Sequence, residues 1–342
     1  MSSIWHLVVE PELLAGIGAT HYVPARLAED GFVHCCGEPA SAVAVARDYF
    51  AAATAPVFLL ELDPRRLDAR LVFEVPAPLP GAPTAHLETA EKFPHVYGPI
   101  ALRAIAGAVR LERAGGTFRW PEGFAPLGES LGRELAARLS AGEARGLMAL
   151  RKLRRSHSRA LRKAPAKLVL EIGAALVASR APGARVLGSE LVLHHPTALA
   201  EIRVRDVKRL AGELASWSDV DVFACMIAGQ AFRDGRVSEA EVLRWTRSRH
   251  RWWRRAALVS TVPLNVKAQG GPGDARRTLR ICRALLDDPD DMVVKALSWA
   301  LRALAERDPS AVRRFLEVHQ NELALRALRE VRNKLRTGRK SG

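Results

Sequence analysis

The chain has 342 residues, 48% of them hydrophobic, and carries a formal net charge of +15. It is long enough for two domains with buried cores. It has no run of 18 apolar residues and no secretory signal pattern, so we expect a soluble, cytoplasmic, monomeric protein without membrane spans. The four cysteines lack C-x-x-C spacing, which argues against a disulfide framework or a zinc ribbon.

The charge is unevenly distributed along the chain. Residues 1–127 contain 10 Lys+Arg and 14 Asp+Glu (net −4), whereas residues 128–342 contain 42 and 23 (net +19). The excess in the second part favours a polyanionic partner there. A Pro- and Gly-containing segment near residue 121 separates the two parts, so we predict domains at residues 1–122 and 128–342.

The first part alternates short apolar runs with Pro and Gly. This pattern predicts strands at Ile4–Val9, Val57–Leu62, Leu71–Val75 and Ile105–Leu111. Ala and Val at helical spacing predict one helix, over Ala40–Ala53. Residues 1–122 are therefore predicted to form a small α+β domain.

From residue 130 onward the pattern is that of successive amphipathic helices with short breaks. Ser238 followed by Glu241 forms a capping box at the start of one helix. Paired helices at 238–247 with 250–261, and at 274–286 with 289–307, predict an all-α, HEAT-like helical-repeat solenoid.

Three tryptophan-containing fragments stand out in the helical part: SWSDVD (216–221), WWRRAAL (252–258) and KALSWALR (295–302). Trp217 and Asp221 are four residues apart and share one helix face. An aromatic ring beside a carboxylate attracts a cationic target. The alternative is that each Trp belongs to the core and that the Asp caps its helix.

These fragments resemble the HEAT-repeat DNA alkylation-repair glycosylases of the AlkD type. The resemblance implies hydrolytic excision of N3- or N7-alkylated purines from duplex DNA, with no cofactor and no metal. It implies that Trp217, Asp221 and Trp299 line the catalytic cleft, with Asp221 stabilising the cationic sugar. It also implies that Arg255 and Arg302 bind DNA phosphates.

A separate basic segment spans residues 151–163 and contains no acidic residue. We expect it to contact phosphate, although a solvated helix face is the alternative. The candidate DNA-binding residues in this segment are Arg151, Lys152, Arg154, Arg155 and Arg159.

In the first domain, the motifs GFVHC (31–35) and FPHVYGP (93–99) resemble the uncharacterised bacterial family DUF952. This resemblance implies an ADP-ribosyltransferase-like fold and makes NAD a candidate ligand. Histidines bind phosphate and transfer protons near neutral pH. We therefore place five polar residues around a cleft: His6, His34, Glu74, His95 and Tyr97. The alternative is that FPHVYG is a rigid turn whose side chains bind backbone groups.

Two other functions remain open at this point. The solenoid could bind bent or branched DNA without catalysis, or it could direct an NAD-using transferase in the first domain to DNA. The histidines are scattered and show no ligand spacing, so no metal is expected.

Overall fold

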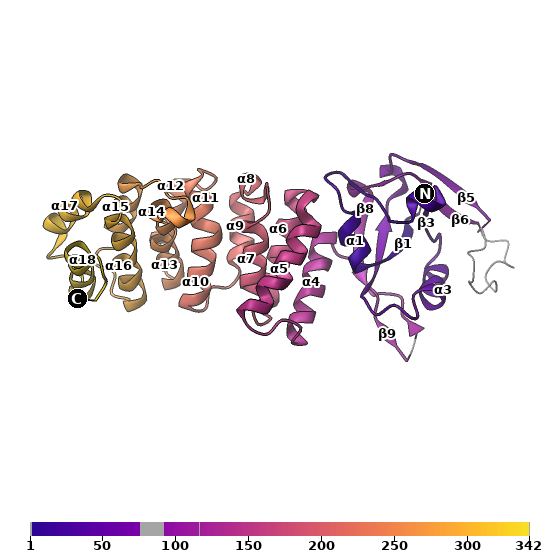
Figure 1. Ribbon diagram of the computed structural model, residues 1–342, viewed down its shortest axis with the longest axis horizontal. Coiled ribbons are helices and arrows are strands. Elements are labelled where there is room, and N and C mark those ends of the chain that lie inside the picture. Colours follow the sequence, from indigo (N-terminus) through magenta and orange to yellow (C-terminus); the bar gives the residue numbers. More distant parts are fainter. Residues whose placement is uncertain (1, 76–91, 116, 342) are drawn as a thin grey trace. The chain divides into compact units, whose positions relative to one another are not determined.

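The computed structural model describes residues 2–75, 92–115 and 117–341. The chain divides into two compact units, residues 1–175 and 176–342. The first unit contains an α+β region followed by helices, and the second is helical (Figure 1). The predicted order, an α+β part followed by an all-α part, is therefore confirmed. The likeness of the first part to the ADP-ribosyltransferase fold stays a prediction.

The main sheet of the first unit has the antiparallel order β1-β4-β8, formed by β1 (Ile4–Val9), β4 (Val57–Leu62) and β8 (Ile105–Arg110). β1 and β4 begin and end at the predicted residues. The register pairs Ile4 with Leu62. The central strand β4 is almost entirely buried, as expected for a strand covered on both faces.

A second sheet has the order β3-β6-β5, with β3 (Val33–His34), β6 (Phe93–Tyr97) and β5 (Arg70–Glu74). The sequence did not predict β6, because its second residue is Pro94 and proline cannot donate to a ladder. The carbonyl of Pro94 accepts from the Cys35 amide (3.0 Å), just beyond the end of β3. The nitrogen of Pro94, which carries no hydrogen, therefore faces the chain just beyond the end of β3, outside the paired residues.

The remaining elements of the α+β region are short. One helix, α3, packs against β1 and covers a cluster that includes Leu59. The bounds are α1 (Glu10–Gly16), β2 (His21–Tyr22), α2 (Leu27–Asp30), α3 (Pro39–Tyr49), β7 (Ile100–Ala101), β9 (Arg113–Ala114) and β10 (Thr117–Phe118).

Helix α4 (Leu127–Ser140) packs against β8 and is joined to the α+β region by ion pairs. Arg110 Nη1 lies 2.9 Å from Glu134 Oε2, and Arg138 Nη1 lies 2.6 Å from Glu10 Oε2. Both carboxylates are buried. The first helix of the helical part thus packs on the sheet and belongs to the first unit.

The other helices follow one another with short breaks, and the division between the units falls within α6. They are α5 (Leu147–Ala160), α6 (Ala166–Ser179), α7 (Ala184–Leu193), α8 (Ala198–Glu201), α9 (Val204–Ala211), α10 (Trp217–Phe223), α11 (Gly229–Arg233), α12 (Glu239–Thr246), α13 (Arg251–Val259), α14 (Val262–Asn265), α15 (Ala275–Arg283), α16 (Asp291–Ala305), α17 (Pro309–His319) and α18 (Leu325–Thr337).

The predicted helix pairs correspond to α12 with α13 and to α15 with α16, and the members of each pair pack together. The Ser238 hydroxyl accepts a hydrogen bond from the Glu241 amide (3.2 Å), which confirms the predicted start of α12. Within the second unit, α10, α13, α16 and α18 pack in succession. Their assignment to HEAT repeats stays a prediction. In the described part of the chain, no helix is both long and apolar enough to cross a bilayer.

Two glycines allow α4 to approach α6 closely within the first unit. A Cβ on Gly132 would lie 2.6 Å from Ala175 Cβ and 2.7 Å from the Ile172 carbonyl oxygen. Gly128 meets Leu168 and Glu171 in the same way. The spacing of four residues places both glycines on one face of α4.

We predict that Gly132→Ala lowers the free energy of unfolding by about 1–3 kcal/mol, because the added methyl group forces the two helices apart. Alanine is the better helix former by only about 1 kcal/mol, which does not offset the clash. Gly123→Ala is the matched control, since nothing lies within 4 Å of its Cβ position. Urea unfolding measures both, and equal midpoints would contradict the close helix contact.

Candidate functional site

Ser216 caps the start of helix α10, which carries two aspartates with different environments. The Ser216 hydroxyl accepts from the Asp219 amide (3.2 Å), and Arg185 Nε lies 3.1 Å from Asp219 Oδ1. Asp219 is therefore the acidic residue that belongs to the helix start. Asp221 is half a turn further on and contacts a different helix, α13, so the helix-cap alternative applies to Asp219 and not to Asp221.

Asp221 is held by Arg255 of α13. Arg255 Nε and Nη2 donate to Asp221 Oδ1 (3.0 and 2.8 Å), and Nη2 also lies 2.9 Å from Oδ2. Arg255 Nη1 donates to the backbone carbonyl of Met292 in α16 (2.6 Å). One guanidinium thus connects α10, α13 and α16.

The predicted phosphate contact of Arg255 does not fit this position. Arg255 is only 5% exposed, and each of its three guanidinium nitrogens makes a hydrogen bond inside the unit. The sequence missed this because the contact with Asp221 joins two helices 34 residues apart. Arg255 is therefore the partner of the Asp221 carboxylate.

The Asp221 side chain is 20% exposed, so its carboxylate reaches solvent from one side. Partial burial raises the pKa of Asp221, and the charge and hydrogen bonds of Arg255 oppose this rise. Cys225 follows one turn later, at the π-helical segment Ala224–Ala228. Burial, assisted by the negative charge of Asp221, raises the pKa of the Cys225 thiol to about 12, so at neutral pH it is not a thiolate nucleophile.

The tryptophans fall into two groups. Trp245 and Trp252 are buried, and Trp253 packs against Phe223 and Trp245 with ring centroids 5.9 and 5.2 Å apart. The core alternative is correct for Trp252 and Trp253, and Trp245 is also a core residue. Trp217, in contrast, is 56% exposed at the start of α10. An exposed indole one turn from a carboxylate is available to a ligand.

Trp299 lies on α16 and is half-buried. It is seven residues, about two turns, beyond Met292, so the two residues share one face of α16. Arg302 is also half-buried, and its Nε donates to Ser298 Oγ (3.1 Å). The structure thus places Trp217, Asp221, Trp299 and Arg302 on helices that pack in succession within the second unit.

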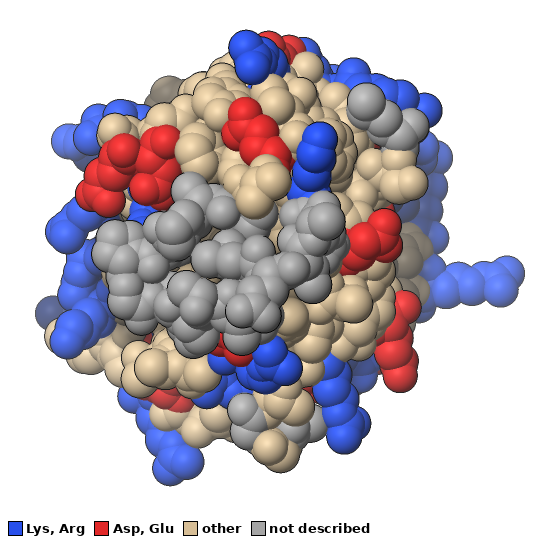
Figure 2. Space-filling view, turned by 90° about the vertical axis from the view of Figure 1, so that its right-hand side faces the viewer, with Lys and Arg blue, Asp and Glu red and all other residues tan. Residues whose placement is uncertain are grey.

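The basic segment forms α5 and the turn after it, in the first unit. Arg154 is half-buried. The other four candidate side chains are exposed, namely Arg151, Lys152, Arg155 and Arg159. Among the described residues, Lys152, Arg155 and Arg159 have no acidic partner. The face shown in Figure 2 differs, because acidic and basic side chains are interspersed there with uncharged surface.

The five predicted residues of the first domain do converge. His6, His34 and His95 line one pocket, and Glu74 Oε2 accepts from His95 Nδ1 (3.0 Å) and from the Tyr97 hydroxyl (2.8 Å). Strand pairing places His34 opposite His95. FPHVYG is therefore a strand that presents side chains to a pocket, and the rigid-turn alternative is wrong.

Several pocket residues were not predicted. They are an exposed arginine, Arg26, and an aromatic wall that includes Phe32, Tyr49 and Phe93. Alternation along the strands was a usable signal for two of them, since Phe32 precedes His34 by two residues and Phe93 precedes His95 by two. Nothing local marks Arg26 or Tyr49, which reach the pocket from other elements.

Residues 146–335, more than half of the chain, match the sequence profile of the DNA alkylation repair enzyme family. The chain belongs to this family. Membership assigns it a role in DNA repair with DNA as the substrate. Residues 9–108 match DUF952, a family of unknown function. The Trp217 and Asp221 fragment and the basic helix α5 both lie within the repair-enzyme match.

Two X-ray structures of protein CC0527 from Caulobacter crescentus, one of a double mutant, resemble a part of this chain. They are 19% and 18% identical to it, and each comparison covers 34% of this chain and 94% of that chain with a TM-score of 0.27. A comparison with curated proteins finds no match. Among the residues that the structure describes, no group of three potential ligands could hold a metal ion.

We predict that Arg255→Met lowers the free energy of unfolding of the second unit by about 3–5 kcal/mol, because it leaves the partly buried Asp221 carboxylate without its cation. Arg251→Met is the matched control on the same helix. Arg251 is half-exposed and lies 3.4 Å from Asp290, a kind of pair worth about 0–1 kcal/mol. Chemical unfolding followed by circular dichroism compares the two, and similar losses would contradict the structural role of Arg255.

Proposed function

We propose that this family member is a DNA glycosylase that hydrolytically excises N3- or N7-alkylated purines from duplex DNA without a metal ion. The observation that carries the proposal is the Asp221 carboxylate, which Arg255 holds from one side while the other side reaches solvent beside exposed Trp217. The family match to DNA alkylation repair enzymes supports the same conclusion.

The chemistry suits a single carboxylate. An N3- or N7-alkylated purine is cationic and leaves as a neutral base, so strong acid catalysis is unnecessary. As the glycosidic bond breaks, positive charge develops on the sugar, and water adds to the anomeric carbon while losing a proton. A fixed negative charge stabilises this transition state and can orient the water. Asp221 would supply both effects.

The two available tryptophans would hold the lesion. The exposed ring of Trp217 and the half-buried ring of Trp299 offer faces to the deoxyribose and attract the cationic base. Neither ring is among the aromatic contacts that hold Trp245 and Trp253 in the core. This difference supports a binding role for Trp217 and Trp299.

Arg255 would act as a positioning residue. Its bonds to both carboxylate oxygens fix the orientation of Asp221, and its charge limits the rise of the Asp221 pKa. Phosphate binding then falls to Arg302 and to the exposed cations of α5. Like-charged side chains on a helix without acidic neighbours suit a polyanion.

We predict that Asp221→Asn reduces base release from methylated duplex DNA by about 10²–10³-fold while DNA affinity stays close to that of the unchanged protein, because Asn keeps the size and loses the charge. Asp219→Asn is the matched control, since Asp219 serves the helix start. Chromatography of free bases measures release. Undiminished release by Asp221→Asn would refute the assignment, and no release by the unchanged protein would favour the DNA-binding alternative.

The same assay has a pH signature. The ionised carboxylate is the active form and burial raises its pKa, so activity should fall on acidification at a pH above the ordinary range of an aspartate. Arg255→Lys, which keeps the charge, should leave this acid limb nearly in place. Arg255→Met should move it to higher pH. A limb at the same pH in both variants would contradict the positioning role of Arg255.

We predict that the triple change Lys152→Gln, Arg155→Gln and Arg159→Gln weakens DNA binding and reduces the slope of log affinity against log salt by up to about 3, because each lost phosphate contact removes about one unit. The control makes the same change of charge at Arg65, Arg66 and Arg103 of the α+β region. Fluorescence anisotropy with duplex DNA over a salt series gives both slopes. An equal decrease in the control would show that only net charge matters.

A further inference from the structure

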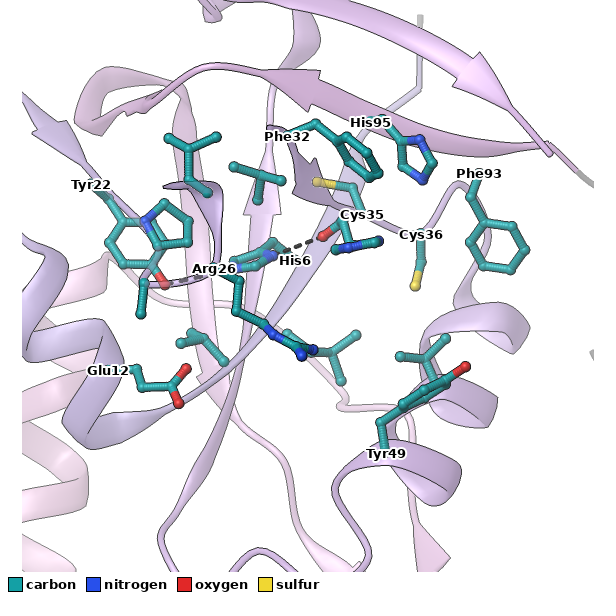
Figure 3. A pocket seen from close by; sticks show the side chains of 18 of the residues that line it. His6, Glu12, Tyr22, Arg26, Phe32, Cys35, Cys36, Tyr49, Phe93 and His95 are labelled. Carbon is teal, nitrogen blue, oxygen red and sulfur yellow. Dashed lines mark hydrogen bonds between the residues drawn. The ribbon is translucent and has the colours of Figure 1, made fainter. Parts of the chain in front are cut away.

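The α+β region contains a cavity of about 190 Å³ with aromatic walls. Figure 3 shows Tyr22, Phe32, Tyr49 and Phe93 arranged around it, with His6 and His95 between them. At about 30 Å³ for each water in the liquid, the volume equals roughly six waters. This is room for one small planar ring system, and a larger ligand would extend past the rim.

His95 presents an unsatisfied nitrogen to this cavity. The residue is 2% exposed, and its ring stacks on Phe32 with centroids 4.1 Å apart. An ionised carboxylate can only accept, so the proton on the Glu74 side is on His95 Nδ1. Hydrogen bonds from His95 and Tyr97 lower the pKa of Glu74 and keep it ionised. Within the described ranges, His95 Nε2 has no hydrogen-bond partner.

His6 contributes an acceptor nitrogen. Its Nδ1 donates to the His34 carbonyl (2.8 Å), and burial lowers its pKa to about 4, so the ring is neutral at pH 7. The lone pair is therefore on Nε2, which accepts a long hydrogen bond from the Tyr22 hydroxyl (3.5 Å). The acceptor of His6 and the imidazole of His95, set between aromatic walls, favour a planar nitrogen heterocycle, which both donates and accepts hydrogen bonds.

The rim adds charged groups. Arg26 lines the cavity and is exposed, and no acidic residue among those described pairs with it. Figure 3 shows its side chain extending across the cavity beside His6. An unpaired guanidinium at the mouth suits a phosphate oxygen. Glu12, also at the rim, can accept a further N–H.

We propose that this pocket binds a nucleotide, with the nitrogen heterocycle stacked between the aromatic walls and hydrogen-bonded to His95 and His6, and with the phosphate at Arg26. The residues of this binding site are not those proposed for base excision, and nucleotide binding does not depend on that activity. A dinucleotide such as NAD would insert one of its two rings, because the cavity holds no more.

Isothermal titration calorimetry of the full-length protein with adenine, AMP, NAD and ribose 5-phosphate tests the proposal. We expect AMP to bind more tightly than adenine and ribose 5-phosphate to bind weakest. NAD binding tighter than AMP would assign the dinucleotide as the ligand. Binding of ribose 5-phosphate as tight as that of AMP, or no binding of any of the four at millimolar concentration, would overturn the proposal.

Two variants locate the ligand. His95→Asn retains a donor at the position of Nδ1 for Glu74 and removes the atom at Nε2, so we expect adenine and AMP to bind about tenfold more weakly. His95→Gln, which places an amide near the Nε2 position, should restore part of the affinity. Unchanged AMP affinity in folded His95→Asn would overturn the assignment of His95.

Arg26→Ala tests the rim independently of the buried histidine, because Arg26 is exposed and its loss leaves the core intact. Affinity for AMP should fall about tenfold and affinity for adenine should not change. Arg119→Ala, an exposed arginine of the same region outside the cavity lining, is the matched control. Equal effects of Arg26→Ala and Arg119→Ala on AMP would overturn the phosphate position.

Discussion

The contact of one guanidinium with one carboxylate organises the helical unit. Arg255 contacts Asp221 in α10 and the Met292 carbonyl in α16, and it does so from α13, which packs between these two helices. A partly buried carboxylate without this cation would be costly. The same bonds orient Asp221 beside Trp217, so the stability of the unit and the geometry of the candidate site depend on one side chain.

Local patterns in the sequence predicted the parts of the fold that depend on local physics. Short apolar runs between Pro and Gly located β1 and β4, and the Ser238 capping box located the start of α12. The spacing of Trp217 and Asp221 placed both on one helix. The long-range contact of Arg255 was invisible, because residues on different helices have no fixed sequence spacing, and Pro94 concealed β6 for a geometric reason that only the position of β3 reveals.

The N-terminal pocket shows the same division. The polar residues His6, His34, Glu74, His95 and Tyr97 could be chosen from their motifs, and strand pairing brought His34 opposite His95. The aromatic wall and Arg26 come from elements separated along the chain, and only the fold brings them together. Motifs thus identified the polar groups, and alternation could have identified Phe32 and Phe93, whereas Arg26 and Tyr49 have no local signature.

The docking of α4 on the sheet also bears on how the segment between the two matched ranges is held. The segment between the matched ranges, residues 109–145, contains the last part of β8 and all of α4. Arg138 of this segment pairs with Glu10, which lies within the DUF952 match. The segment is structural, so an exchange of either region with that of a relative would have to carry α4 and its partners along with the sheet.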